Sequence, residues 1–226
     1  MSRNHLKKKQ SHNKSNWIIS QFYPPDYAAT GQLLNELAIY LSKRGLLVNI
    51  FTSFPFYAFS EKDTLKKENY RSLNIYRIGN FKFIKKIKGY RIINGLIFCF
   101  QSFINLIFRA NKKDTLIYTT EPAFLPLFAY LVFIFKKSKY ILIIYDLYPD
   151  IITKFNILKE KNFIIRIWRI ILRSSYRNSS KIIVLSESMK EELNKNYLEF
   201  SDKVEVISSW ADHKKIIPID KDKNWF

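Results

Sequence analysis

The sequence has 226 residues, of which 47% are hydrophobic, so the chain is long enough to bury a core as one domain of ordinary to large size. Its 38 lysines and arginines outnumber 19 acidic residues, and the formal net charge of +19 favours anionic partners such as nucleic acid, anionic lipid or phosphate-bearing substrates. The single cysteine, Cys99, excludes an internal disulfide bond, and the presence of only three histidines argues against a zinc site or a Ser-His-Asp triad.

The first 15 residues form a basic segment without an acidic residue. Its charges are Arg3, Lys7, Lys8, Lys9 and Lys14. No apolar run follows before Trp17, so we do not expect a secretory signal here. We expect residues 1–15 to be a disordered basic tail.

A strand, a loop and a helix are expected in succession after this tail. Residues 17–20 are typical of a buried strand, and the loop that follows contains Pro24 and Pro25. Apolar residues then recur at three- and four-residue spacing, which predicts an amphipathic helix; they are Leu33, Leu34, Leu37, Ala38 and Leu41. Gly45 suits the C-terminal cap of this helix, and residues 47–52 predict a second strand. The unit is therefore βαβ, and its two strands are expected to be parallel.

The beginning of this helix is the first candidate ligand site. Gly31 lies near the helix N-terminus, where free backbone N–H groups bind anionic ligands such as phosphate. A single glycine is a weaker signal than a full G-x-G-x-x-G fingerprint, and Gly31 could equally serve only a tight turn. The pattern alone leaves both interpretations open.

Residues 81–113 contain basic side chains and no acidic one. Within them, the uncharged run 92–108 has only a narrow polar stripe, formed by Asn94, Gln101 and Asn105. A helix that is apolar around most of its circumference is either buried or in contact with lipid. The run is marginal for a membrane span, which needs about 20 apolar residues. Two interpretations remain open: an interfacial helix on an anionic membrane, and a core helix that covers a sheet.

The rest of the chain alternates strand and helix patterns. Strands are predicted at 73–78, 116–119, 140–145, 181–185 and 204–207, and helices at 123–135, at about 162–176 and from Ser186, a candidate N-cap, onward. About seven strands joined mostly by helices predict a doubly wound α/β fold with a mostly parallel, Rossmann-like sheet.

Ligands of such sheets bind beyond the carboxyl ends of the strands. Three polar groups fall at that edge: the loop 23–31, Thr120 with Glu121, and Asp146 with Asp150. For Asp146, a turn or cap at the end of its strand is the alternative to a functional role, because Pro149 also favours a turn.

Several ordered motifs together resemble the N-terminal domain of family 4 glycosyltransferases. They are Tyr23-Pro24-Pro25, Thr30-Gly31, Arg44-Gly45, Asp146-Leu147-Tyr148-Pro149-Asp150, Ile183-Val184-Leu185-Ser186 and Trp210-Ala211-Asp212. The resemblance extends from about Trp17 to Asp212 and is closest to enzymes that assemble bacterial surface polysaccharides. It implies one half of a GT-B architecture, in which two Rossmann-like domains face a cleft. The acceptor binds on the N-terminal side of that cleft and a nucleotide-sugar donor on the other.

The resemblance also implies roles for individual residues. Thr30 and Gly31 match the glycine loop that approaches the donor diphosphate. Asp146 matches the position of a catalytic carboxylate, which orients the acceptor hydroxyl or stabilises positive charge on the sugar. Tyr23, Glu121 and Asp150 are the implied acceptor-binding residues. The implied reaction transfers a hexosyl group to a lipid-linked or polysaccharide acceptor, with no metal ion and no other cofactor.

The domain organisation expected from the resemblance is a Rossmann-like domain at 16–210 followed by a truncated interdomain linker at 211–226. The donor-binding half is then expected on a separate polypeptide, or lost by truncation. The protein is expected in the cytoplasm, peripheral on the inner face of the cell membrane. A catalytically inactive remnant or membrane-surface module is the alternative function. A nucleic-acid binder, suggested by Phe81, Phe83 and Tyr90 among lysines, ranks last because no known nucleic-acid motif is present.

Overall fold

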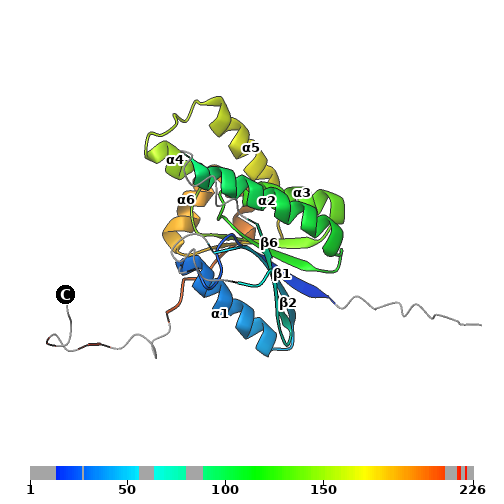
Figure 1. Cartoon of the computed structure of the whole chain (residues 1–226). Helices are drawn as coiled ribbons and strands as arrows, with labels where there is room; N and C mark the ends of the chain where they lie inside the picture. The colour runs from blue at the N-terminus through cyan, green and yellow to red at the C-terminus, as the bar shows by residue number, and fades with distance from the viewer. Residues whose placement is uncertain are drawn as a thin grey trace, which may run out of the picture.

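The computed structural model describes residues 14–26, 28–55, 64–79, 89–211, 218–219 and 222. These residues form one eight-stranded sheet in the order β3-β4-β2-β1-β5-β6-β7-β8 (Figure 1). The strands are β1 (Ser15–Ile19), β2 (Leu47–Ser53), β3 (Lys67–Tyr70), β4 (Leu73–Ile78), β5 (Thr115–Thr119), β6 (Lys139–Ile144), β7 (Lys181–Val184) and β8 (Val204–Val206). The helices are α1 (Ala29–Lys43), α2 (Tyr90–Arg109), α3 (Leu125–Lys136), α4 (Asp150–Lys154), α5 (Phe163–Asn178), α6 (Glu187–Tyr197) and the 3-10 turn η2 (Leu198–Lys203).

The predicted mostly parallel α/β sheet is confirmed. Every pair of neighbouring strands is parallel except β3 and β4, which form an antiparallel hairpin at the sheet edge. The sequence did not predict β3, because its four residues are largely exposed and polar and carry no alternating pattern. The short helix α4 was also not predicted, since residues 146–150 indicated only a turn.

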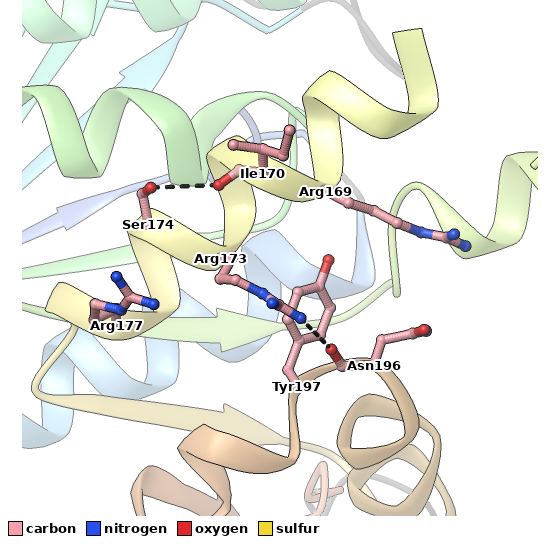
Figure 2. Close-up of a pocket in the computed structure, with 7 residues that line it drawn as sticks. All are labelled: Arg169, Ile170, Arg173, Ser174, Arg177, Asn196 and Tyr197. Carbon is pink, nitrogen blue, oxygen red and sulfur yellow. Dashed lines mark hydrogen bonds between the residues drawn. The ribbon is translucent and has the colours of Figure 1, made fainter. Parts of the chain in front are cut away.

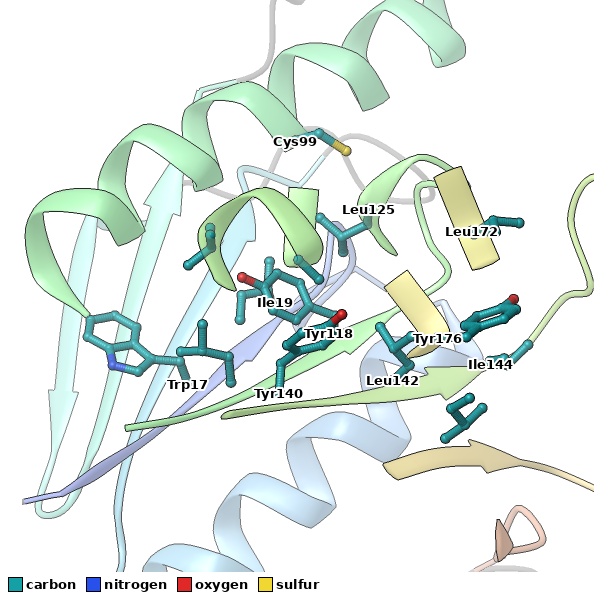
Figure 3. Close-up of a cluster of buried hydrophobic side chains, with 14 of the residues drawn as sticks. Trp17, Ile19, Cys99, Tyr118, Leu125, Tyr140, Leu142, Ile144, Leu172 and Tyr176 are labelled. Carbon is teal, nitrogen blue, oxygen red and sulfur yellow. The ribbon is translucent and has the colours of Figure 1, made fainter. Parts of the chain in front are cut away.

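The helices cover the two faces of the sheet unequally. Helix α1 packs on one face, against a cluster that includes Ile18, Ile50 and Ile75. Helices α2, α3 and α5 lie on the other face, over a larger aromatic-rich core (Figures 1 and 3). Tyr118 and Tyr140 are fully buried there and pack edge to face, with ring centroids 6.3 Å apart. Tyr118 belongs to this core, whereas the preceding β5 residue, Ile117, belongs to the cluster under α1, as the period-two alternation of a strand requires.

A buried carboxylate fixes the amino-terminal edge of the sheet. Asp114 precedes β5 and is only 2% exposed. It accepts hydrogen bonds from the backbone N–H of Ser15 at 3.0 Å, from the indole N–H of Trp17 at 3.1 Å and from the backbone N–H of Asn111 at 2.9 Å. These bonds join β1 to β5 at their starts, so the two strands enter the sheet in a fixed register.

The C-terminal end of α1 follows its prediction. Gly45 has a positive φ of 82°, its N–H donates to the Ser42 carbonyl, and the N–H of Leu46 donates to the Leu41 carbonyl. This pair of bonds is the Schellman arrangement, in which glycine takes the left-handed position without strain.

Helix α2 is, within the described ranges, the one helix long and apolar enough to cross a membrane, judged by length and composition alone. One side of it packs on the sheet and includes Asn94, Cys99 and Ser102, all buried. One side of α2 therefore covers the sheet, as a core helix does. Contact with lipid stays a prediction for the other side of the helix.

Several predicted features lie outside the described residues. Residues 1–13 of the predicted tail are among them, as are 80–88 with the lysines and phenylalanines of that segment. Most of the predicted linker 211–226 is also outside, apart from residues 211, 218, 219 and 222. Ser15, the last residue of the predicted tail, is the first residue of β1.

Replacing Gly31 by alanine is expected to destabilise the fold. A Cβ at Gly31 would lie 3.1 Å from the backbone nitrogen of Tyr23 and 3.2 Å from the carbonyl carbon of Phe22, and backbone atoms cannot rotate away. We expect the free energy of unfolding to fall by about 1–3 kcal/mol, as measured by urea denaturation. Gly79→Ala is the control, because no atom of the described residues lies within 4 Å of its added Cβ. Equal stability of the two variants would contradict the close packing.

Candidate functional site

Three loops converge at the carboxyl ends of β1, β5 and β6. They are residues 20–26, 120–124 and 145–149, and parallel pairing brings them to the same edge of the sheet. The backbone N–H of Gln21 donates to the Glu121 carbonyl at 3.4 Å, which joins the first loop to the second. The buried side chain of Arg77 on β4 donates to the Pro24 carbonyl at 2.7 Å and pairs with Glu68 at 2.9 Å. The proline loop is thus held from both sides.

Thr120 joins the second loop to the third. Its hydroxyl oxygen accepts hydrogen bonds from the backbone N–H groups of Tyr145 at 3.0 Å and Asp146 at 3.2 Å. Thr120 is 3% exposed, so water does not compete for these bonds. The direction of the chain after β6 is therefore fixed by a side chain that follows β5.

Glu121 is the half-buried carboxylate of the second loop. One of its oxygens accepts a hydrogen bond at 2.8 Å from the hydroxyl of Thr30, in the first turn of α1. Burial raises the pKa of Glu121 above its ordinary value, the Thr30 bond opposes that rise, and the negative charge of Asp146 adds to it. Because folding raises this pKa, the native state loses stability as the pH rises from the ordinary carboxyl range through the folded-state pKa.

Asp146 lies close enough to Glu121 to influence its ionisation. Burial also raises the pKa of Asp146 itself. None of the described residues donates a hydrogen bond to the Asp146 carboxylate. Two tyrosines of the same loop respond to these charges: burial and Glu121 raise the pKa of Tyr145 to about 12, and burial, Asp146 and Glu121 raise that of Tyr148. The edge therefore holds two carboxylates whose ionised forms are only partly compensated.

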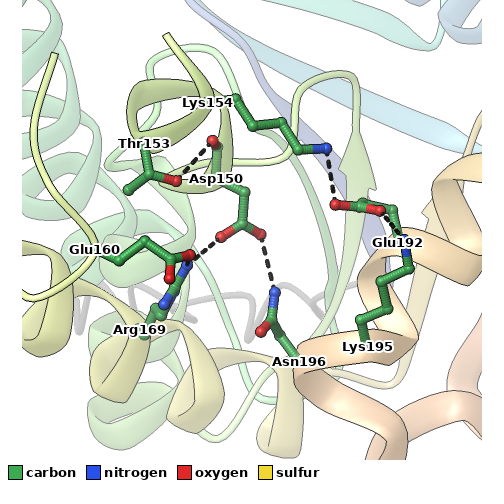
Figure 4. A network of polar contacts seen from close by, with 8 residues as sticks. All are labelled: Asp150, Thr153, Lys154, Glu160, Arg169, Glu192, Lys195 and Asn196. Atoms are coloured by element: carbon green, nitrogen blue, oxygen red, sulfur yellow. Dashed lines mark hydrogen bonds and ion pairs between the residues drawn. The ribbon is translucent and has the colours of Figure 1, made fainter. Parts of the chain in front are cut away.

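Asp150 is placed differently from the other two acidic residues. It begins α4 and is 8% exposed. Its oxygens accept hydrogen bonds from Arg169 of α5 at 2.7 Å and from Asn196 of α6 at 3.3 Å (Figure 4). The carboxylate thus connects three helices, and its role in binding an acceptor stays a prediction.

The remaining predicted residues are found at the start of α1. Tyr23 is buried, and its hydroxyl donates to Asn35 of α1 at 2.7 Å. Gly31 lets the backbone of Phe22 and Tyr23 pack directly on the helix. Ala28 caps α1 without a side-chain hydrogen bond, and the first turn contains no acidic residue. The first-turn N–H groups therefore have no side-chain cap, which suits an anion.

Two apolar cavities lie on either side of this edge. One, of about 160 Å³, is lined by Ala123, Phe124, Leu127, Ile164, Ile167, Trp168, Ile171 and Leu172. The other, of about 110 Å³, is lined by residues of α1, β6 and β7 and by the segment 207–210. The indole of Trp168 stacks on both Phe124 and Tyr148, with ring centroids 4.7 and 6.1 Å away. The first cavity therefore adjoins the acidic loops.

Sequence reasoning identified the acidic pair but missed the role of Trp168. The residue lies in a helix whose basic pattern was recognised, and nothing local distinguishes it. Its stacking partners come from the loops after β5 and β6, so only the tertiary structure reveals the contact. Among the described residues, no cluster of three or more His, Cys, Asp or Glu side chains has the arrangement needed to hold a metal ion.

A sequence profile of Glycosyltransferase Family 4 matches residues 30–215. The chain belongs to glycosyltransferase family 4. This family 4 chain is also 27% identical over 149 residues to WbjE of Pseudomonas aeruginosa, described as a probable glycosyltransferase. The match covers 63% of the chain and 36% of WbjE, so the chain spans about a third of that relative's length.

Solved structures share the fold of this family 4 chain. Sucrose-phosphate synthase from Thermosynechococcus elongatus superposes with a TM-score of 0.66 at 11% identity, over 92% of this chain and 51% of the synthase. HepE of Anabaena, solved in complex with UDP, has a TM-score of 0.50 at 9% identity, over 88% of this chain and 44% of HepE. An E. coli trehalose-6-phosphate protein bound with UDP-2-fluoro glucose has a TM-score of 0.51 at 11% identity, over 83% of this chain and 42% of the E. coli chain. The chain corresponds to about half of a GT-B fold.

The coupling of the acidic pair predicts specific pKa changes in this family 4 chain. Asp146→Asn is expected to lower the pKa of Glu121, because it removes a neighbouring negative charge. Thr30→Val is expected to raise it, because it removes the hydrogen bond to the ionised form. The side-chain carboxyl resonance of Glu121, followed by NMR against pH, measures both. Glu160→Gln is the control; an Asp146→Asn variant with an unchanged Glu121 pKa would contradict the coupling.

Proposed function

We propose that this family 4 chain supplies the acceptor side of a sugar-transfer site, in which a hexosyl group passes from a nucleotide-sugar to an acceptor hydroxyl. The carrying observation is the pair of partly compensated carboxylates, Glu121 and Asp146, at the carboxyl ends of β5 and β6. The family match and the likeness to GT-B structures support this assignment. The acidic pair gives the chain a chemistry that a purely structural turn would not need.

Asp146 is the proposed catalytic residue. Its carboxylate has no hydrogen-bond donor among the described residues and is partly removed from water, so it is available to accept a hydrogen bond from an acceptor hydroxyl. The same negative charge would stabilise the positive charge that develops on the transferred sugar. Glu121, held by Thr30, offers its other oxygen to orient the acceptor.

The donor is proposed to approach from the start of α1. The helix has no side-chain cap, and its first-turn N–H groups at Thr30 and Gly31 favour a negatively charged diphosphate. The UDP and UDP-sugar complexes of the similar HepE and E. coli structures support a nucleotide-sugar partner. Most contacts to the donor would then come from the second half of the GT-B fold.

The acceptor is proposed to be lipid-linked or a polysaccharide, with the lipid-linked form favoured. The apolar cavity between α3 and α5 adjoins the acidic loops through Phe124 and Trp168, so we place part of the acceptor's hydrocarbon chain there and its polar group at Asp146. We accordingly propose a peripheral location on the inner face of the cell membrane. An inactive membrane-surface module is the second candidate, favoured by the exposed apolar side of α2.

A transfer assay tests the function. The chain is expressed together with any coding sequence that continues beyond Phe226, and membranes and radiolabelled nucleotide-sugars are supplied. We expect label to enter the lipid extract, and Asp146→Asn to lower turnover by at least about 100-fold with little change in the donor KM. Glu205→Gln, which removes an exposed carboxylate paired with Lys181, is the matched control.

Two results would count against the proposal. Full turnover in the Asp146→Asn protein would remove this residue from the site. A folded protein that transfers sugar from none of the nucleotide-sugars, although membranes are present, would favour the inactive module instead.

A further inference from the structure

Between Arg91 and Arg109, the exposed residues of α2 are apolar, whereas two of its polar residues face inward. Asn94 and Ser102 are buried against the sheet. Exposed positions of the same helix are Ile92, Ile93, Leu96, Phe100, Ile104 and Phe108. A helix that covers a sheet in water has the opposite distribution, with its polar residues outside. The outward side of α2 is therefore suited to an apolar environment.

Helices α3 and α5 extend this apolar surface. Helix α3 packs between α2 and α5 in the same layer. The ring of Phe103 of α2 contacts that of Phe135 of α3 edge to face, with centroids 6.0 Å apart. Exposed apolar residues of α3 and α5 are Ile134, Phe135, Phe163, Ile164, Ile167 and Ile170. We call the exposed apolar residues of α2, α3 and α5 the apolar face. These residues lie on three neighbouring helices of one layer, and large exposed apolar surfaces mark sites of interaction.

The charge on these helices is entirely positive. None of α2, α3 and α5 contains an aspartate or glutamate, while α1 contains Glu36 and α6 contains Glu187, Glu191 and Glu192. Basic residues stand at the ends of α2 and α3, at Arg91, Arg109 and Lys136. Positive charge around an apolar surface is complementary to the anionic headgroups of a bilayer.

Helix α5 combines both properties along adjacent stripes. Its arginines recur every three or four residues at Arg166, Arg169, Arg173 and Arg177, beside the exposed stripe of Phe163, Ile167 and Ile170. Three of these arginines line a cavity of about 320 Å³ between α5 and α6, which Ile170 also lines (Figure 2). Arg169 and Arg173 are paired with Asp150 and Glu199 there. The cavity is a polar recess directly beside the apolar face.

We propose that the apolar face is a docking surface for an anionic lipid bilayer, with the α5 arginines and the recess beside them contacting lipid phosphates. The proposal rests on the proposed function, since it specifies how the transferase would meet a lipid-linked acceptor. Docking by this face orients the cavity between α3 and α5 toward the bilayer, because Ile164 and Ile167 belong to both. Phe124 and Trp168 of this cavity adjoin the loops that carry the acidic pair.

Vesicle flotation of the purified chain tests the docking face. The vesicles contain phosphatidylcholine alone or mixed with phosphatidylglycerol, and no donor or acceptor is added. Leu96→Ser/Ile104→Ser is compared with Ile39→Ser/Leu46→Ser on the α1 side, because Leu96 and Leu46 are both 42% exposed and Ile104 and Ile39 are 39% and 38% exposed. We expect the first pair to weaken binding to anionic vesicles by at least about tenfold and the second pair to leave it unchanged.

The arginine contribution is tested in the same assay. Arg166→Gln/Arg177→Gln is expected to weaken binding by about fivefold per arginine, while Lys43→Gln/Arg44→Gln at the end of α1 has little effect. Added salt should also weaken the binding of the wild-type protein to anionic vesicles. Thermal unfolding followed by circular dichroism confirms that each variant is folded.

Three outcomes would overturn the proposal. In the first, the folded chain fails to bind anionic vesicles at low salt. In the second, the two apolar double variants lose vesicle binding equally. In the third, ultracentrifugation shows a stable dimer that binds no vesicles and that Leu96→Ser/Ile104→Ser dissociates. The flotation and transfer results separate the two proposals. Vesicle binding without sugar transfer contradicts only the function, and transfer without vesicle binding contradicts only the docking face.

Discussion

The parallel pairing of β1, β5 and β6 is the constraint on which the site depends. Parallel strands end at the same edge, so loops that are distant in the sequence are brought together there. Side chains then fix the details: Thr120 holds the start of the β6 loop, and Thr30 reaches from α1 to Glu121. At the opposite edge, Asp114 locks the register in which β1 and β5 enter.

The acidic residues differ most in how completely their carboxylates are bonded. Asp114 accepts three hydrogen bonds, and Asp150 is held by an arginine and an amide, so both serve to join elements of the fold. Glu121 has one donor, and Asp146 has none among the described residues. Incomplete pairing of a half-buried carboxylate costs stability, and such a cost is typical of a group kept for binding or catalysis.

Much of the fold could be predicted because local patterns agree with tertiary packing. The alternation of apolar strands and amphipathic helices gave the parallel sheet, and Gly45 ended α1 as expected. The acidic edge followed from strand ends alone. The stacking of Trp168, the bonding of Asp150 and the packing at Gly31 could not be predicted, since each depends on residues brought from other elements. The exposed side of α2 required the structure, because an apolar helix does not reveal which side meets the sheet.

The central claim is that an acceptor binds at the edge formed by Glu121 and Asp146. The most direct measurement is covalent labelling with a polyprenyl-diphosphate monosaccharide that carries a diazirine on its sugar, followed by mass spectrometry of the labelled peptides. The account predicts label in residues 119–124 and 145–149, at the carboxyl ends of β5 and β6. Label confined to the amino-terminal edge, in residues 111–115 and 137–140, would contradict it.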